Sequence, residues 1–279
     1  MNKFVKILDI NFTTLKESEI IELIKKTLKS SDSQTMFIAT PNPEMLIEAN
    51  QNAHFKNILQ NTGLNLPDGN GLIWARKFNL ATTHDKNKIL ILIKGVFSLI
   101  KFLFEPKDEK IPFNKAIHGS DLMNNICLDK DLSRHKIFLL GNSNGLKRNT
   151  SSLVKQSLLK KNQDINIIGN LDSTPTADIL EEIGQQKPEI LFVAFGSPKQ
   201  EIWLAENLPK LPSIKIAIGV GGSFDFIAGI IPRAPILMRK LGLEWLFRLY
   251  KQPKRIKRII NATIKFPIMV ISSRLKGHR

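Results

Sequence analysis

Residues Ile190–Asp225 read ILFVAFGSPKQEIWLAENLPKLPSIKIAIGVGGSFD. This stretch contains two continuous apolar runs, Ile190–Phe195 and Ile214–Val220, and each run ends in a turn of small residues. A continuous apolar run of this length is typical of a parallel strand that is buried on both faces. Open α/β sheets bind their ligands at the carboxyl ends of such strands. The stretch therefore predicts a buried parallel sheet with a candidate site at its turns, although the same turns also occur in α/β proteins that bind nothing there.

Three residues in these turns are suited to contact a ligand. Gly221 and Gly222 carry no Cβ, so the backbone can approach a bound molecule closely. Gln200 offers an uncharged donor and an uncharged acceptor. We interpret all three as candidate substrate-binding residues.

The rest of the chain alternates between short apolar runs and segments of helical periodicity. This alternation predicts a doubly wound α/β fold, in which helices flank a parallel sheet. The predicted strands are Phe4–Ile10, Met36–Ala39, Leu64–Leu66, Lys136–Leu140 and Ile165–Ile168, and the predicted helices include Ser18–Leu28, a helix from Pro43 through about Leu59, Thr150–Lys160 and Ala177–Gln185.

Length and charge limit the classes of protein to consider. A chain of 279 residues suits one large α/β domain, or one domain with an appendage. The formal net charge of +16 favours an anionic partner, which could be nucleic acid, nucleotide phosphates or an acidic membrane. Residues 239–279 hold twelve Lys and Arg against one acidic residue. We therefore expect a domain over residues 1–238 and a basic helical appendage over residues 239–279.

Several classes of protein are disfavoured by what the sequence lacks. Cys127 is the single cysteine, which argues against a disulfide framework or a thiolate metal site and favours a reducing, cytoplasmic location. The first residues, MNKFVKILDINFTTLK, lack the apolar core of a signal peptide. No run reaches the roughly 18–20 apolar residues that span a bilayer.

Other predicted strands are followed by polar residues or glycine. Thr40 and Asn42 follow the strand Met36–Ala39, where they could bind a ligand or cap the next helix. Asp68 lies in a Pro-Asp-Gly sequence, which could be a plain turn or could present a general base. Gly141 begins another strand-to-helix turn, but neither a full dinucleotide fingerprint nor a P-loop is present, so NAD and ATP are weak cofactor candidates.

Residues from about 80 to 114 resemble an insertion. Within them, Ile89–Phe104 reads ILILIKGVFSLIKFLF, which predicts a helix with apolar residues over most of its surface and two lysines on one face. Such a helix could lie on an anionic membrane surface, or it could be buried against a second subunit of a homo-oligomer.

Taken together, these segments resemble the WecG/TagA/CpsF glycosyltransferases, glycosyltransferase family 26. The resemblance covers nearly the whole chain except the insertion, and its motifs follow the family's order. They are TPNPEML, PDGNGLIWA, GSDL, IFLLGNSNG, FGSPKQEIW, GVGGSFDFIAG, PRAP and GLEWLFRLYKQPKRIKR.

The resemblance implies the GT-E type of Rossmann-like fold. It also implies inverting, metal-independent transfer of a sugar from a UDP-sugar to an undecaprenyl-diphosphate-linked glycolipid, with no cofactor. The sugar could be N-acetylmannosamine, its uronic acid or glucose. Such an enzyme would lie in the cytoplasm, attached peripherally to the inner face of the cell membrane, and would contribute to cell-surface polysaccharide or teichoic acid synthesis.

The resemblance also suggests roles for individual residues. Asp68 matches the proposed catalytic base. The donor and sugar pocket would be lined by Thr40, Asn42 and Gln200. The lipid diphosphate would be held by Arg248, Arg255 and Arg258, and Gly141 and Arg233 are further candidates for binding substrate.

The sequence departs from the family at the insertion and before Gly119. Family members often carry an arginine just before the Gly-x-Asp-Leu motif, whereas Ala116, Ile117 and His118 occupy these positions here and Lys115 is the nearest cation. The cation that stabilises the leaving diphosphate is therefore left open. Two other functions remain as alternatives, a nucleic-acid-binding protein and a non-catalytic assembly subunit. The first is disfavoured because no recognised RNA or DNA motif is present, and the second because Asp68 and Gln200 are both retained.

Overall fold

The computed structural model describes residues 4–31, 34–104, 113, 116–141, 149–173, 179–232, 234–235, 238, 244–251, 253 and 256–277. Predictions made for Lys115, Arg233 and Arg255 lie outside these residues, and so does the side chain of Arg248.

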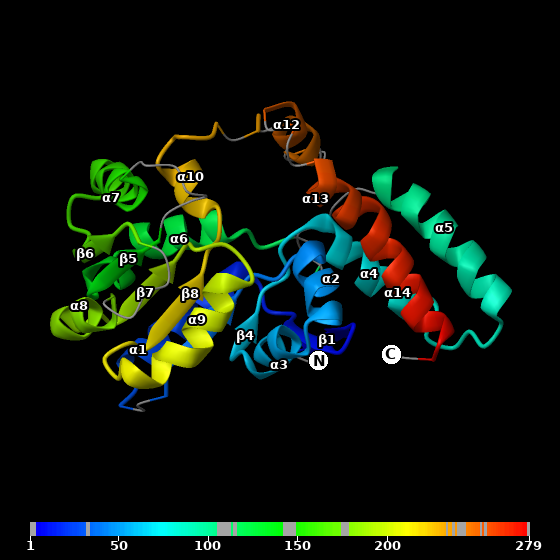
Figure 1. Ribbon diagram of the computed structural model, residues 1–279, viewed down its shortest axis with the longest axis horizontal. Helices are drawn as coiled ribbons and strands as arrows, with labels where there is room; N and C mark the ends of the chain where they lie inside the picture. Colours follow the sequence, from blue (N-terminus) through cyan, green and yellow to red (C-terminus); the bar gives the residue numbers. More distant parts are fainter. Residues whose placement is uncertain are drawn as a thin grey trace.

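A six-stranded parallel sheet forms the centre of the molecule, with the strand order β4-β3-β8-β7-β5-β6 (Figure 1). Each strand pairs in parallel with its neighbours. The predicted α/β fold with a parallel sheet is therefore confirmed. The strands are β3 (Met36–Ala39), β4 (Leu64–Asn65), β5 (Ile137–Leu140), β6 (Ile167–Leu171), β7 (Ile190–Val193) and β8 (Ile216–Gly219).

Both faces of the sheet are buried because successive side chains of each strand point to opposite faces. Ile137 and Leu139 of β5 contribute to one hydrophobic cluster, and Phe138 and Leu140 to the other. The first cluster includes buried residues of α1 (Glu17–Lys29), α6 (Gly119–Leu128), α7 (Thr150–Lys161) and α10 (Ser223–Ile227). The second includes residues of α2 (Pro43–Gln51), α3 (Ala53–Asn61), α4 (Asn70–Ala81), α8 (Ile179–Gln186) and α9 (Lys199–Asn207).

Two sequence predictions about the amino-terminal part were wrong. The predicted strand Phe4–Ile10 is a hairpin of β1 (Phe4–Ile7) and β2 (Ile10–Thr13), because Leu8 and Asp9 form a tight turn with φ of 50° and 67°. The helix predicted from Pro43 through about Leu59 is interrupted at Asn52, whose side chain accepts a hydrogen bond from Phe55 N and so begins α3.

The predicted helix in the insertion is confirmed as α5 (Lys88–Phe104), which lies beside α14 (Phe266–Leu275) at one end of the molecule (Figure 1). Between α14 and the preceding helices α12 (Glu244–Lys251) and α13 (Ile256–Ile260) runs a short π-helix, Asn261–Lys265. None of the helices within the described residues is both long and apolar enough to cross a bilayer.

The carboxyl-terminal helix is tightly packed. Phe266, Val270 and Ile271 are buried and belong to the same hydrophobic cluster as one face of the sheet. A Cβ on Gly95 of α5 would lie 2.7 Å from Ile271 Cδ1, so α5 and α14 are in close contact. The division of the chain at residue 238 stays a prediction, but α14 is part of the folded core and is not a peripheral segment.

A buried arginine anchors α14 to the end of α4. Arg274 donates hydrogen bonds through Nη2 to the carbonyl oxygens of Thr82 and Thr83, the latter at 2.9 Å, and through Nε to Thr82 Oγ1 at 3.3 Å. These carbonyls follow the last turn of α4, where a helix leaves its acceptors without partners. The guanidinium therefore satisfies the carboxyl end of one helix from another helix more than 190 residues later in the chain.

We predict that Arg274→Ala lowers the free energy of unfolding by about 1–3 kcal/mol, because buried carbonyls lose a charged donor. Urea denaturation monitored by circular dichroism measures this loss. Lys276→Ala is the matched control, since Lys276 is exposed at the same end of α14 and its loss should change stability by less than about 0.5 kcal/mol. Equal stability of the Arg274 variant and wild type would show that this anchor contributes nothing.

Candidate active site

Five of the predicted site residues lie where strands of the parallel sheet end. Thr40 and Asn42 follow β3, Asp68 follows β4, and Gly221 follows β8, while Gln200 begins α9 after β7. Because the strands are parallel, their carboxyl ends share one edge of the sheet, where ligands of α/β proteins bind. We call this the carboxyl edge.

Asp68 is held in this edge by backbone hydrogen bonds. Leu66 N donates to Ala39 O at 2.9 Å, and Asp68 N donates to Pro41 O at 2.9 Å. On the other side, Ile117 N donates to Pro67 O at 2.8 Å. The segment after β4 therefore runs beyond the sheet between the segment after β3 and the segment before α6. This central segment presents Asp68, whose side chain is 29% exposed.

The partner of the Asp68 carboxylate is His118, with its Nδ1 at 2.6 Å from Asp68 Oδ1. In the sequence, His118 stands where the family's arginine is absent, and its contact with Asp68 was not predicted. Its position directly before Gly-Ser-Asp-Leu was the available signal, but fifty residues separate the two side chains in the chain. An imidazole that holds a carboxylate in place is an arrangement suited to proton transfer.

Thr40 and Asn42 both have structural partners. Thr40 Oγ1, which is buried, donates to Gly219 O at 3.1 Å and so ties the end of β3 to the end of β8. Asn42 Oδ1 accepts hydrogen bonds from Glu44 N at 3.0 Å and Met45 N at 3.1 Å. The capping role considered for Asn42 is therefore confirmed, and a direct role of either residue in binding substrate stays a prediction.

Gln200 supports the glycine turn that follows β8. Its Oε1 accepts a hydrogen bond from Gly221 N at 3.0 Å, and its Nε2 donates to Glu201 Oε1 at 2.6 Å. A Cβ on Gly219 would lie 2.9 Å from Gln200 Nε2, so a larger residue there would displace the amide. Since Gly221 N–H already has this partner, we do not assign it to a phosphate. Contacts of Gln200, Gly221 and Gly222 with a substrate remain predictions.

Gly141 is required by packing at the end of β5. Its φ is +130°, and a Cβ there would approach the backbone of Ala194 to 2.7–2.9 Å. Any side chain at this position would separate the ends of β5 and β7. The residues that follow Gly141 lie outside the described part of the chain, so its predicted role beside the substrate stays a prediction.

The basic carboxyl-terminal region reaches this edge through Arg258. Arg258 Nε pairs with Glu44 Oε2 at 2.8 Å, in the first turn of α2 and next to the Asn42 cap. Phe266 also packs close to Gly71, at the start of α4. The helices α12, which ends at Lys251, and α13, which begins at Ile256, are separate elements, and Arg255 lies between them outside the described residues.

No cluster of three or more His, Cys, Asp or Glu that could hold a metal ion occurs among the residues whose placement is described. The prediction of a metal-independent reaction is not tested by this observation and stays a prediction.

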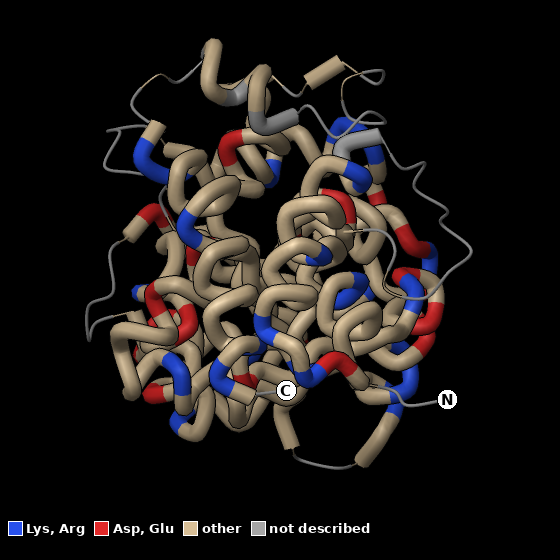
Figure 2. Tube along the Cα trace, turned by 90° about the vertical axis from the view of Figure 1, so that its right-hand side faces the viewer, with Lys and Arg blue, Asp and Glu red and all other residues tan. Residues whose placement is uncertain are grey.

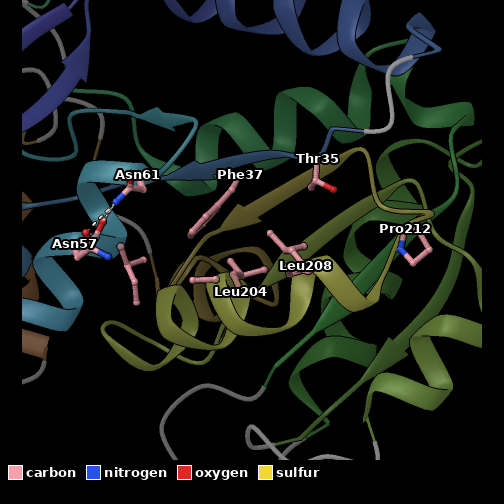
Figure 3. A pocket seen from close by; sticks show the side chains of 10 residues that line it. Thr35, Phe37, Asn57, Asn61, Leu204, Leu208 and Pro212 are labelled. Atoms are coloured by element: carbon pink, nitrogen blue, oxygen red, sulfur yellow. Dashed lines mark hydrogen bonds between the residues drawn. The ribbon is translucent and has the colours of Figure 1, made fainter.

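A groove with a volume of about 640 Å³ lies away from the carboxyl edge (Figure 3). Thr35 and Phe37 line it at the start of β3, Asn57 and Asn61 from α3, and Leu204 and Leu208 from α9 and the turn after it, with Pro212 at its far end. Thr35 and Pro212 precede β3 and β8, so the groove lies toward the amino ends of these strands. Asp68 and the glycine turn lie at the other ends.

Comparison with known proteins decides the family. The model of the glycosyl transferase WecG/TagA/CpsF family matches residues 5–100 and 94–279, which together span almost the whole chain. This chain belongs to the WecG/TagA/CpsF family. The two matched segments overlap at residues 94–100, within α5, so the match is divided there but includes the residues of the predicted insertion.

Two relatives of this WecG/TagA/CpsF protein carry the same name, N-acetylglucosaminyldiphosphoundecaprenol N-acetyl-beta-D-mannosaminyltransferase. The relative from Bacillus spizizenii is 27% identical over 90% of this chain and 86% of its own length. The relative from Staphylococcus aureus strain MRSA252 is 26% identical over 91% of this chain and 87% of its own length. The similarity therefore extends through the fold and the carboxyl edge alike.

Behind the glycine turn of this family member lies a buried carboxyl group. Glu201 is fully buried, and its Oε2 is without a hydrogen-bond partner among the described residues. Burial raises the pKa of Glu201 to about 7, against a smaller lowering by its hydrogen bond from Gln200. The Glu201 carboxyl therefore keeps its proton to a higher pH in the folded protein than in the unfolded chain.

We predict that this proton makes stability fall as pH rises. Between the ordinary glutamate pKa of about 4.3 and the folded value of about 7, the folded state binds more protons than the unfolded state, so the free energy of unfolding decreases with increasing pH. Glu201→Gln removes this titration and keeps an acceptor for Gln200. Urea denaturation from about pH 5 to about pH 8 should show wild type losing stability relative to the variant. Parallel pH dependences of the two proteins would contradict the assignment.

Proposed function

We propose that this protein transfers N-acetylmannosamine from its UDP conjugate to an undecaprenyl-diphosphate-linked N-acetylglucosamine glycolipid, in the synthesis of teichoic acid or another cell-surface polysaccharide. The single observation that carries the proposal is the placement of Asp68 at the carboxyl edge of a protein whose named relatives perform this transfer. The relatives' names favour N-acetylmannosamine over its uronic acid or glucose. The names of these relatives give no support to nucleic acid as a partner.

The reaction would be a displacement with inversion at the anomeric carbon. The acceptor hydroxyl oxygen forms a bond to this carbon while the bond between the carbon and the diphosphate oxygen breaks, and UDP leaves with the electron pair. The acceptor proton passes to the Asp68 carboxylate. General-base catalysis of this kind needs a carboxylate within hydrogen-bond reach of the hydroxyl, and Asp68 is partly exposed at the edge where substrate would bind.

The leaving diphosphate requires positive charge or backbone donors. Two backbone donors of the glycine turn are already used within the protein, because Gly221 N donates to Gln200 Oε1 and Ser223 N donates to Val220 O. We therefore assign the diphosphates of donor and acceptor to the arginines of the carboxyl-terminal half. Arg258 supports this role because it already reaches the first turn of α2 beside Asn42, and Arg233, Arg248 and Arg255 are proposed to join it.

The surface of α5 supports a place at the anionic inner face of the membrane, where a polyprenyl-linked acceptor would be found. We call the exposed apolar residues of this helix the α5 face: Ile89, Leu90, Leu92, Ile93, Val96, Phe97 and Ile100. The helix contains no acidic residue, and its Lys88 and Lys101 are exposed. Figure 2 views the molecule from the side on which α5 and α14 lie, where lysines and arginines, with some acidic residues, are scattered over a largely uncharged trace. Apolar area with basic residues around it is suited to anionic lipid.

Replacement of Asp68 tests the proposed base. Asp68→Asn keeps the shape of the side chain and removes its basicity, so turnover should fall by about 100-fold or more while UDP-sugar binding is largely kept. The assay incubates the protein with UDP-N-acetylmannosamine and a short-chain polyprenyl-diphosphate-N-acetylglucosamine, with the uronic acid and glucose donors in parallel. Asp131→Asn, at an exposed carboxylate before β5, is the matched control and should be fully active. Near wild-type turnover of Asp68→Asn would exclude the role.

Removal of metal tests the proposed mechanism. Turnover by wild type should persist after dialysis against EDTA, because the proposal assigns the diphosphate charge to arginines and not to a divalent ion. Loss of turnover that returns on addition of manganese or magnesium would overturn this part of the proposal.

Flotation with liposomes that contain anionic lipid tests the α5 face, at high salt to weaken the contribution of the basic region. Phe97→Glu should weaken lipid binding about tenfold or more, because burying a phenylalanine in lipid is worth roughly 1.5–3 kcal/mol. Leu153→Glu on α7 is the control, since Leu153 is also an exposed apolar residue but lies outside α5. Unchanged flotation of Phe97→Glu, with loss of an oligomer, would show instead that α5 contacts a second subunit.

A further inference from the structure

We propose that His118 is a positioning residue for the catalytic base: it donates its Nδ1–H to Asp68 Oδ1 and so directs Asp68 Oδ2 toward the acceptor hydroxyl. This inference rests on the proposed sugar transfer for its catalytic meaning. The contact on which it is built, Nδ1 to Oδ1 at 2.6 Å, belongs to the resting protein.

The backbone fixes His118 independently of its side chain. The carbonyl oxygen of His118 accepts hydrogen bonds from Asp121 N and Leu122 N, both at 3.0 Å, and so begins α6. The preceding residue, Ile117, donates to Pro67 O at 2.8 Å, next to Asp68. His118 is therefore held between the start of α6 and the segment that carries the base.

The surroundings place this pair at the site and not in the core. The side chains of His118 and Asp68 are 34% and 29% exposed, so both face the carboxyl edge. The neighbouring Gly119 packs closely against the end of β8 and against β3, since a Cβ there would lie 3.3 Å from Ser223 Oγ and 3.6 Å from Thr40 Oγ1. The pair thus adjoins the turns that follow β3 and β8.

The chemistry of the two groups assigns their roles. An ionised carboxylate accepts only, so the hydrogen between the two atoms must be carried by His118 Nδ1. With Oδ1 engaged, Oδ2 is the oxygen that takes the acceptor proton, as the oxygen–carbon bond to the sugar forms and the bond to UDP breaks. His118 keeps its Nδ1–H throughout this step and is neither proton acceptor nor nucleophile.

The alternative follows from the same contact. In a Ser-His-Asp triad the carboxylate orients the imidazole and the imidazole takes the proton. If that held here, His118 would be the base and Asp68 its support. The two readings differ in what an asparagine at position 118 can do, because its side-chain amide can supply an N–H near the place of Nδ1 but cannot act as a base.

Steady-state kinetics of His118→Ala and His118→Asn separate these roles. Loss of positioning in His118→Ala should lower kcat by about 10- to 100-fold with little change in either KM, since small misplacements of a reacting group carry costs of this order. His118→Asn should recover kcat to within about threefold of wild type, because an amide donor replaces Nδ1–H. Full activity of His118→Ala, equal loss in both variants, or a raised KM at unchanged kcat would each overturn the proposal.

The molecule contains a matched control for these variants. His135 Nδ1 pairs with Glu189 Oε1 at 3.0 Å, just before β5 and β7 begin, and its side chain is 26% exposed. This imidazole–carboxylate pair lies at the amino ends of the strands, so His135→Ala removes the same kind of contact away from Asp68. Its kcat should equal that of wild type, and an equal loss in His135→Ala and His118→Ala would mark the effect as general destabilisation and overturn the proposal.

A second readout does not depend on sugar transfer. Side-chain ¹⁵N NMR of the resting protein, with the His118 signals assigned by their loss in His118→Asn, should show a protonated Nδ1. A neutral ring protonated only at Nε2 would contradict the donor role. If wild type transferred no sugar from any UDP donor while Nδ1 proved protonated, the proposed function would fail and the contact itself would stand.

Discussion

The parallel pairing of β3 with β8 is the constraint on which the candidate site depends. Ile38 pairs with Ile218, and two residues beyond this pair Thr40 Oγ1 donates to the carbonyl oxygen of Gly219. The segment after β3 then accepts the backbone hydrogen bond from Asp68 N. Since the carboxylate is placed by main-chain contacts, its position follows from the register of the sheet. A slip of one residue would turn every buried side chain of the strand to the opposite face. Such a slip is disfavoured because it would remove these side chains from the two hydrophobic clusters.

Much of this arrangement could be predicted from sequence, because the decisive signals are local. Continuous apolar runs such as Ile190–Val193 indicated buried parallel strands, and the position of Asp68 after a strand indicated the edge of the sheet. The hairpin at Leu8 and Asp9 was missed because leucine rarely adopts the left-handed conformation that Leu8 has in this turn. The His118 contact was missed for another reason. Pairing between side chains fifty residues apart depends on tertiary structure, and the spacing of apolar residues along the sequence does not indicate it.

The carboxyl-terminal region shows how composition can mislead about burial. Twelve basic residues in 41 suggested a basic helical appendage outside the main domain. Yet α14 places Phe266 and Val270 in the core, and one of its basic residues, Arg274, is buried because it satisfies backbone carbonyls after α4. Charge counts do not distinguish an arginine that binds a ligand from one that completes a helix. The same packing carries Arg258 to the start of α2, so the folding of the tail and the assembly of the proposed diphosphate site are physically linked.

In the proposed function, the nucleotide binds at the carboxyl edge, over the turns after β3, β4 and β8. Amide hydrogen exchange with and without saturating UDP is the decisive measurement, because it reports each segment separately. We expect slower exchange on UDP binding in residues 40–44, 66–70 and 219–222, with no change around the groove lined by Asn57, Asn61 and Leu208. Protection confined to that groove, with the turns that follow β3, β4 and β8 unaffected, would show that the nucleotide does not bind at the carboxyl edge.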